Sequence, residues 1–164
     1  MKSTKDQLDN IYKKLRKDVE QVLKKDVAQA IIDEECNIID IMVYQEYTPT
    51  MYTRREENDG LIDKDNYKSS IVEKAHSIEL NVENQTMANP WIYDQNGNRY
   101  KSRNANEYLL PIVENAGRYD FPETSGVYDF PKPIRETTVK VLKQDKTVEE
   151  ILGKQLRDRG WDIE

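Results

Sequence analysis

Apolar residues recur at helical spacing through the first quarter of the chain, and they predict one long helix over about 3–41. The positions that step by threes and fours are Leu8, Ile11, Leu15, Val19, Val22, Leu23, Val27, Ala30 and Ile31. After Val27 the apolar positions spread around the helix, so its start is expected to be exposed and its end buried. Two interpretations remain open: the helix packs on the chain's own core, or a partner covers part of it.

Alternation of apolar and polar residues predicts strands in the middle of the chain. Residues 77–83 read SIELNVE, a pattern typical of a strand with one buried and one wet face. Residues 91–93 begin a second strand, and Asn96-Gly97 is the two-residue signal of a type I′ hairpin. The preceding residues, 63–72, are instead predicted to form a short polar helix or turn.

Turn and helix-end signals divide the remainder of the chain. Asn58-Asp59-Gly60 predicts a turn that returns Leu61 to the body of the protein. Residues 108–113 are spaced for a short helix, with Gly117 placed to end it. Pro133 is placed at the start of a further helix. That helix is expected to carry three apolar residues on one face, namely Ile134, Val139 and Leu142.

A last helix is predicted after Thr147. Thr147 and Glu150 have the spacing of a capping box, in which Thr147 is the N-cap. Gly160 is expected to end this helix, and Trp161 just beyond it is a candidate docking group.

The order of these elements predicts an α+β fold with a long N-terminal helix, a small antiparallel sheet and C-terminal helices. A length of 164 residues favours a single domain spanning 1–164. With 37% hydrophobic and 34% charged residues, the chain is polar for a globular protein. This composition leaves two alternatives, a thin core under a solvated surface or a domain completed by neighbouring subunits.

Charge and hydropathy exclude two classes of partner. A net charge of −6 argues against a general binder of nucleic-acid backbones. No run of about 18 apolar residues is present, so we expect no membrane span. The N-terminal residues are charged and lack an apolar stretch, so we expect no signal peptide and synthesis in the cytoplasm.

The residues that usually carry chemistry are sparse. Cys36 is the one cysteine and His76 the one histidine, and no catalytic motif accompanies either. Cys36 is expected to be a buried, inert thiol and His76 a structural residue. Asp59, Asp63 and Asp65 fail the calcium-loop pattern, because glycine follows the first acid and no closing glutamate is present. We therefore expect no catalytic residues, no metal and no cofactor.

Three short motifs follow one another along the chain. They are Tyr52-Thr53-Arg54-Arg55 with Asn58-Asp59-Gly60-Leu61, then Tyr108-Leu109-Leu110-Pro111-Ile112-Val113-Glu114-Asn115-Ala116-Gly117, then Pro131-Lys132-Pro133-Ile134-Arg135-Glu136-Thr137. In order and spacing they resemble the motifs of the tail-component or neck family of tailed bacteriophages, and the resemblance covers roughly Ile41 to the C-terminus. Lys132 and Ile134 replace the arginine and phenylalanine that are commoner in that family.

The resemblance implies a structural virion protein that joins head to tail as a neck, connector or tail-completion component. Such proteins form rings, here a hexamer or dodecamer, between portal or adaptor proteins and tail-tube or tail-terminator proteins. DNA would pass through the ring without specific binding, and the negative charge would line that channel. The implied location is the virion, reached from the host cytoplasm. The alternative is a cytoplasmic protein-binding module without catalytic activity.

The motifs supply the candidate structural and interface residues. These are Tyr52, Arg54, Arg55, Gly60, Leu61, Tyr108, Glu114, Gly117, Pro131 and Pro133. We further predict that Arg55 and Glu114 form a partly buried ion pair that holds the Tyr-rich loop against the short helix. The alternative is that the two charges face solvent separately.

Overall fold

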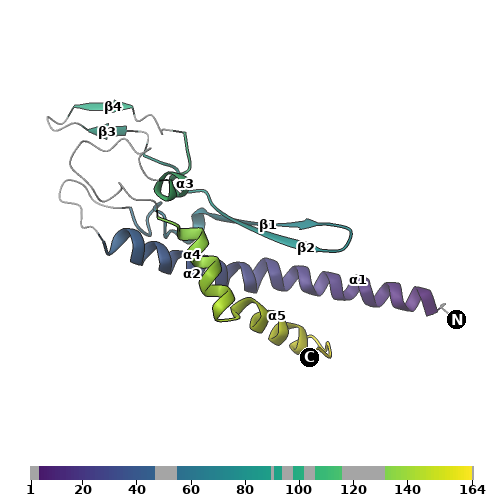
Figure 1. The fold of residues 1–164 in the computed structure, drawn as a ribbon. Coiled ribbons are helices and arrows are strands. Elements are labelled where there is room, and N and C mark those ends of the chain that lie inside the picture. The colour runs from purple at the N-terminus through teal and green to yellow at the C-terminus, as the bar shows by residue number, and fades with distance from the viewer. Residues whose placement is uncertain are drawn as a thin grey trace. The chain divides into compact units, whose positions relative to one another are not determined.

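A computed structural model of the chain describes residues 4–46, 55–89, 91–93, 98–101, 106–115 and 132–163 (Figure 1). Its helices and antiparallel strands confirm the α+β fold class. The chain forms two compact units. Unit 1 comprises Met1–Ile31, Ser69–Val82 and Lys140–Glu164, and unit 2 comprises Ile32–Lys68 and Glu83–Val139. The single domain expected from the length stays a prediction.

The long N-terminal helix is confirmed, and it consists of four consecutive helical elements. They are α1 (Thr4–Val22), the π-helical turn η1 (Leu23–Val27), α2 (Ala28–Ile39) and the π-helical turn η2 (Asp40–Tyr44). Every residue from Thr4 to Lys14 is exposed, whereas Val22 and Ile39 are fully buried. The expected change from an exposed start to a buried end is therefore confirmed.

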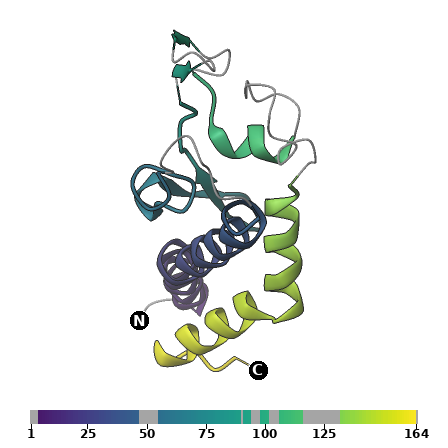
Figure 2. The same cartoon turned by 90° about the vertical axis from the view of Figure 1, so that its left-hand side faces the viewer.

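Helix packing forms the core of unit 1. Val22 and Val27 are buried against Leu156 of α5 (Thr147–Asp158). The partly buried apolar residues around them are Leu15, Val19, Leu23, Ile31, Leu80, Val148, Ile151, Leu152, Trp161 and Ile163. Figure 2 looks along α1 and shows it between the β1–β2 hairpin and α5. Burial of apolar surface on two sides of α1 stabilises this unit.

An antiparallel hairpin contributes β1 (Tyr67–Glu73) and β2 (Ile78–Asn84). The strand expected at 77–83 is confirmed as β2. The helix or turn expected over 63–72 is wrong for most of its length, because only Lys64–Asn66 is helical, as the 3-10 turn η3. Lys68, Ser69 and Ser70 have no apolar alternation, so pairing with β2 decides their conformation. Arg16 of α1 contacts this hairpin, donating to the Lys74 carbonyl at 3.1 Å.

The second predicted hairpin is also present. β3 (Trp91–Tyr93) pairs antiparallel with β4 (Arg99–Lys101), and Trp91 lies opposite Lys101. The turn residues Asn96 and Gly97 lie outside the described residues. The expected short helix is α3 (Leu109–Glu114), and it buries Leu110, Ile112 and Val113. Gly117, expected to end it, also lies outside them.

The helix expected after Pro133 is α4 (Ile134–Gln144). Ile134 and Leu142 are buried, but Val139 is 49% exposed, so the prediction of a shared face is wrong for this residue. Val139 is five positions after Ile134 in the helix, which places the two side chains about 140° apart around the axis.

The start of α5 departs from the predicted capping box. Thr147 is already helical, and the N-cap is Lys146, a left-handed residue with φ of 54° and no side-chain cap. Its carbonyl accepts the Glu150 amide at 3.0 Å. Only two residues separate α4 from α5, so the chain turns through this left-handed residue before a threonine side chain can cap the helix.

The end of α5 is as expected. Gly160 has φ of 85°, and its amide donates to the Arg157 carbonyl while Trp161 donates to the Leu156 carbonyl. These two bonds form a Schellman motif. Trp161 packs on the unit 1 core, and its Nε1 donates to Asp18 at 2.8 Å. The predicted docking role of Trp161 is confirmed.

Candidate functional site

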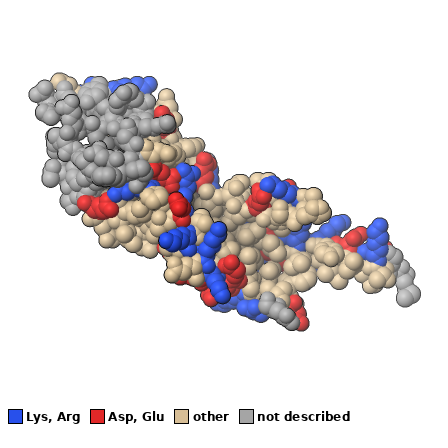
Figure 3. All heavy atoms as spheres, in the orientation of Figure 1, with Lys and Arg blue, Asp and Glu red and all other residues tan. Residues whose placement is uncertain are grey.

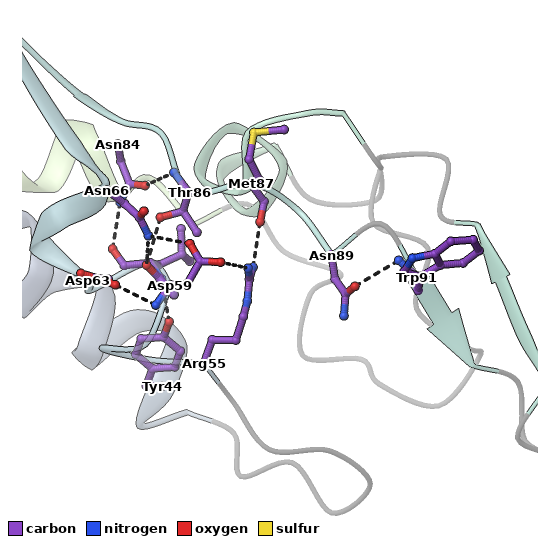
Figure 4. A network of polar contacts seen from close by, with 12 residues as sticks. Tyr44, Arg55, Asp59, Asp63, Asn66, Asn84, Thr86, Met87, Asn89 and Trp91 are labelled. Atoms are coloured by element: carbon purple, nitrogen blue, oxygen red, sulfur yellow. Dashed lines mark hydrogen bonds and ion pairs between the residues drawn. The ribbon is translucent and has the colours of Figure 1, made fainter.

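Six of the candidate residues fall in described parts of unit 2: Arg55, Gly60, Leu61, Tyr108, Glu114 and Pro133. Tyr52, Arg54, Gly117 and Pro131 lie outside the described residues. Figure 4 shows the polar network around the first motif, in which side chains of several segments converge on one turn. We call residues 55–66 the acidic turn, after their carboxylates.

Gly60 is placed in the acidic turn where no other residue fits. A Cβ atom on Gly60 would lie 2.2 Å from the carbonyl oxygen of Glu56 and 2.5 Å from its nitrogen. Two residues of the turn, Glu56 and Asp59, have positive φ angles of 45° and 61°. The Asp63 carboxylate accepts the amides of Asp59 at 2.7 Å and Asp65 at 3.0 Å, which closes the turn locally.

The Gly60 carbonyl is held by three donors. The Thr86 hydroxyl donates to it at 3.0 Å, the Asn66 side chain at 3.2 Å and the Asp63 amide at 3.2 Å. Thr86 is fully buried. A buried hydroxyl needs such a partner, because leaving it unpaired costs about 1–3 kcal/mol.

Leu61 is anchored through its main chain as well as its side chain. The side chain is 2% exposed. Its amide donates to the Tyr44 hydroxyl at 3.1 Å, and its carbonyl accepts from Asn84 at 2.8 Å and from Tyr67 at 3.4 Å. The end of the long helix and the end of β2 thereby meet at one residue of the acidic turn.

Arg55 joins the first motif to the second. Its guanidinium donates to the Met87 carbonyl at 2.8 Å and lies 3.4 Å from the Asp59 carboxylate. Met87 is bridged to Tyr108, and the Leu109 amide donates to the Thr86 carbonyl at 2.7 Å. Residues 86–88 therefore lie between the acidic turn and the start of α3.

Glu114 joins the second motif to the third. Its carboxylate accepts the Arg135 amide at 2.8 Å and the Arg135 Nε at 2.6 Å. The Glu114 side chain is only 11% exposed. The hydrogen bond to Glu114 raises the pKa of Arg135. A carboxylate is favoured here, because the first amides of α4 lack partners within the helix.

The predicted Arg55–Glu114 pair is therefore wrong. Each residue has another partner, Arg55 the Met87 carbonyl with Asp59, and Glu114 the N-terminal end of α4. The alternative, in which the two charges face solvent separately, is also wrong, because both side chains have bonding partners. The sequence did not indicate that Lys132 of the third motif is buried. This residue is 8% exposed and forms an ion pair with Glu46.

A second feature that sequence reasoning missed is a buried cluster on α2. Glu35 is 7% exposed, and its Oε1 has no hydrogen-bond partner. Burial raises the pKa of the Glu35 carboxyl and also that of the Cys36 thiol. The thiol lies 3.8 Å from the Tyr67 hydroxyl. Cys36 is buried as expected, and the apolar character on all sides of 31–42 was the signal that Glu35 would be buried too.

Unit 2 also presents large side chains to solvent near the first two motifs. Met87 is 41%, Tyr108 38% and Trp91 39% exposed. The Arg99 guanidinium lies 4.0 Å from the Trp91 ring centroid, a cation–π geometry. Met, Tyr, Trp and Arg are the residue types enriched in protein interfaces.

Metal binding and membrane insertion are two further functions that the described residues can be searched for. Among the described residues, no group of three His, Cys, Asp or Glu side chains is arranged to hold a metal ion. Asp59, Asp63 and Asp65 instead belong to the acidic turn. None of the helices within the described ranges is long and apolar enough to cross a membrane.

Comparison with known proteins gives one match. The family model YomN matches residues 7–158 of the chain. No curated protein and no solved structure matches it.

Proposed function

The chain belongs to the YomN family, whose name is that of a Bacillus phage- or prophage-derived protein, and on this premise we propose that it is a structural component of a phage virion. The family match supports a relation to phage proteins in general. The finer proposal is a neck, connector or tail-completion protein that joins head to tail. It acts without catalysis and without a cofactor.

The observation that carries the proposal is the family match over 7–158. The three neck-like motifs fall within that range and are connected in unit 2. Arg55 links the first to residues beside the second, and Glu114 links the second to the third. Bonds between the motifs support a role in fixing one scaffold rather than three separate contacts.

The polar composition supports assembly from several copies. Subunits of a ring complete each other's surfaces, so each chain alone has a smaller core and more exposed apolar side chains. Met87, Trp91 and Tyr108 are side chains of this kind. The proposed partners are further copies in a hexameric or dodecameric ring, a portal or adaptor protein, and a tail-tube or tail-terminator protein.

The net charge of −6 fits a channel through which DNA passes without binding. Reversal of lumen-facing carboxylates to lysine is expected to slow DNA passage, because cations would bind the phosphate backbone. Unchanged DNA delivery after such reversal would contradict this part of the proposal.

Deletion of the gene from its phage or prophage, followed by electron microscopy of the particles, tests the role. Filled heads and finished tails that fail to join are the expected result. Heads that leak DNA would identify a stopper, and overlong tails a terminator. Normal infectious particles would overturn the virion role and leave the alternative, a protein-binding module of the host cytoplasm.

A further inference from the structure

The β1–β2 hairpin leaves one edge of β1 without a neighbouring strand among the described residues, because its sheet has two strands. The two ends of the hairpin have the same register. The Lys74 amide donates to the Ser77 carbonyl beside the turn, and the Gln85 amide donates to the Asn66 carbonyl at the other end. Hydrogen-bonded positions alternate along an antiparallel pair. Every second residue of 66–74, counted from Asn66, therefore turns its main-chain groups toward β2.

The residues between them turn their main-chain amides and carbonyls toward the free edge. In the part of β1 that belongs to unit 1 they are Ser69, Ile71 and Glu73. No described residue forms a hydrogen bond to these outward groups. A free edge of this kind is a template for another extended chain, because its unpaired groups match those of a neighbouring strand. Residues 69–73 offer about 17 Å of such edge.

A groove of about 500 Å³ lies between this edge and the long helix. We call it the edge groove, and its lining residues are Lys17, Glu20, Gln21, Lys24, Ser69, Ser70, Ile71 and Glu73. Ser69 and Ser70 have small side chains, so they leave the main chain of the edge accessible. One face of the hairpin packs on the unit 1 core through Leu80. A further strand paired with β1 would therefore lie in the edge groove and direct every second side chain toward α1.

Charge in the edge groove indicates which side chains fit there. The Arg16 guanidinium lies 3.6 Å from the Glu20 carboxylate and 2.9 Å from the Glu73 carboxylate, so it pairs with both acids of the lining. Lys17 and Lys24 are exposed, and neither has an ion-pair partner among the described residues. They lie about 10 Å apart along the helix. With Arg16 counted, the edge groove is net +1, and its unpaired charges are the two lysines.

The preference for acidic side chains is local to the edge groove. Figure 3 shows blue and red side chains interspersed along α1 and the hairpin rather than gathered in one block. Positions on one face of a strand recur every 6.8 Å or so. Carboxylates at alternate positions of a docked strand would thus come within reach of Lys17 and Lys24, whose side chains are long and flexible.

We propose that the free edge of β1 binds an extended segment of a partner protein that carries carboxylates at alternate positions. The main chain of that segment pairs with the outward groups of Ser69, Ile71 and Glu73, and its carboxylates contact Lys17 and Lys24. The free edge requires an extended backbone, and the lysines require acidic side chains on the face toward α1. The edge groove belongs to unit 1 and the three motifs to unit 2, so the inference goes beyond the proposed neck role.

Hydrogen exchange of the isotopically labelled full-length chain tests whether the edge is free. The Ser69 and Ile71 amides are expected to exchange faster than the Ser70 and Val72 amides, because only the latter pair with β2. Equal protection of all four amides would overturn the proposal, since the edge would then already be occupied.

Two synthetic peptides serve as probes of binding. One alternates glutamate with threonine, and the matched peptide has lysine in place of each glutamate. The acidic peptide is expected to slow exchange at Ser69 and Ile71 and to leave Ser70 unchanged. The lysine peptide is expected to bind about tenfold more weakly or less. Binding of the acidic peptide should weaken with salt, because opposite charges are screened.

Variants separate the contribution of charge from that of the main chain. K17E/K24E is expected to bind the lysine peptide in preference to the acidic one. The matched control K5E/K25E changes the net charge equally outside the edge groove and is expected to bind like wild type. S69P removes an outward amide at a strand edge, where proline is tolerated, and is expected to weaken binding of the acidic peptide. Circular dichroism checks that each variant keeps its fold.

Three outcomes would overturn the proposal. The first is no binding of the acidic peptide at about 1 mM, in which case Lys17 and Lys24 would instead protect the edge from pairing. The second is equal binding of the two peptides, or an equal loss in K17E/K24E and K5E/K25E. The third is self-association, measured by sedimentation, that K17E/K24E and S69P both abolish, because a second copy would then occupy the edge groove in place of a separate partner.

Discussion

The two units are stabilised by different kinds of interaction. Unit 1 depends on apolar packing of α1 and η1 against α5, with Val22, Val27 and Leu156 at its centre. The acidic turn of unit 2 is held by hydrogen bonds from buried polar side chains to its main-chain carbonyls. Thr86 donates to the Gly60 carbonyl and Asn84 to the Leu61 carbonyl. Removing apolar contacts one at a time lowers the free energy of unfolding in small steps. Removing one hydrogen-bond partner leaves a buried polar group unpaired, which costs its full desolvation penalty at once. The acidic turn should therefore tolerate fewer changes.

The largest expected effect is on the turn. Gly60→Ala would place a Cβ atom 2.2 Å from a main-chain oxygen, so the backbone must move, and we expect a loss of about 3 kcal/mol in the free energy of unfolding. Urea denaturation measures it. The matched control is Gly153→Ala in α5, where the nearest atom is the flexible Arg157 guanidinium at 3.3 Å. That change should be neutral or stabilising by up to about 1 kcal/mol. Equal losses at both glycines would contradict this account of the turn.

The packing of unit 1 comes next. Leu156→Ala removes a side chain that is 8% exposed from the centre of the core, and we expect a loss of about 2–3 kcal/mol by denaturant titration. Val139→Ala provides the control, since Val139 is 49% exposed and the change should cost less than about 0.5 kcal/mol. Similar losses for the two variants would show that Leu156 is not a core residue.

Removal of one polar partner should cost somewhat less. Asn84→Ala takes away the donor to the Leu61 carbonyl and the acceptor of the Thr86 amide, both buried, with an expected loss of about 2 kcal/mol. Asn81→Ala, at an exposed position of the same strand, is the control and should change little. Hydrogen exchange should be faster at the Thr86 amide in the Asn84 variant alone. Unaltered protection of that amide would argue against the role of this bond.

The smallest effect is a pH dependence. Burial raises the pKa of Glu35 above the 4.5 of an exposed glutamate. The folded state therefore binds the proton more tightly than the unfolded state, so wild-type stability falls as pH rises from about 4.5 to the raised pKa and then levels off. Glu35→Gln should remove that fall and be the more stable protein at neutral pH. Parallel stability–pH curves for the two proteins would contradict the assignment.

The spacing of apolar residues along the chain predicted the elements that bury one face. The apolar stripe of α1 and the alternation of β2 identified their elements, because one buried face imposes a period on the sequence. β1 was missed, since Ser69 and Ser70 carry no such period and their strand forms by pairing with β2. The capping box failed because the left-handed Lys146 precedes α5, and main-chain geometry of that kind is not encoded by side-chain type.

The candidate site was predicted in its residues and not in its bonds. Gly60 and Leu61 were identified from turn chemistry, and both are buried at the centre of the network. Their partners Thr86 and Asn84 follow more than twenty residues later and carry no turn or helix signal of their own. Glu114 was expected to meet Arg55, whereas the unpaired amides at the start of α4 compete for the same carboxylate. Which donor wins depends on the tertiary structure.

The single cysteine allows the rate at which unit 2 opens locally to be measured by thiol labelling. The Cys36 thiol is buried, and its raised pKa keeps it in the unreactive protonated form. A maleimide can modify it only after α2 separates from Ile62 and Tyr67, which the thiol contacts, so the labelling rate of unaltered protein reports how often that happens. Because no other thiol is present, one mass measurement follows the reaction without any engineered probe.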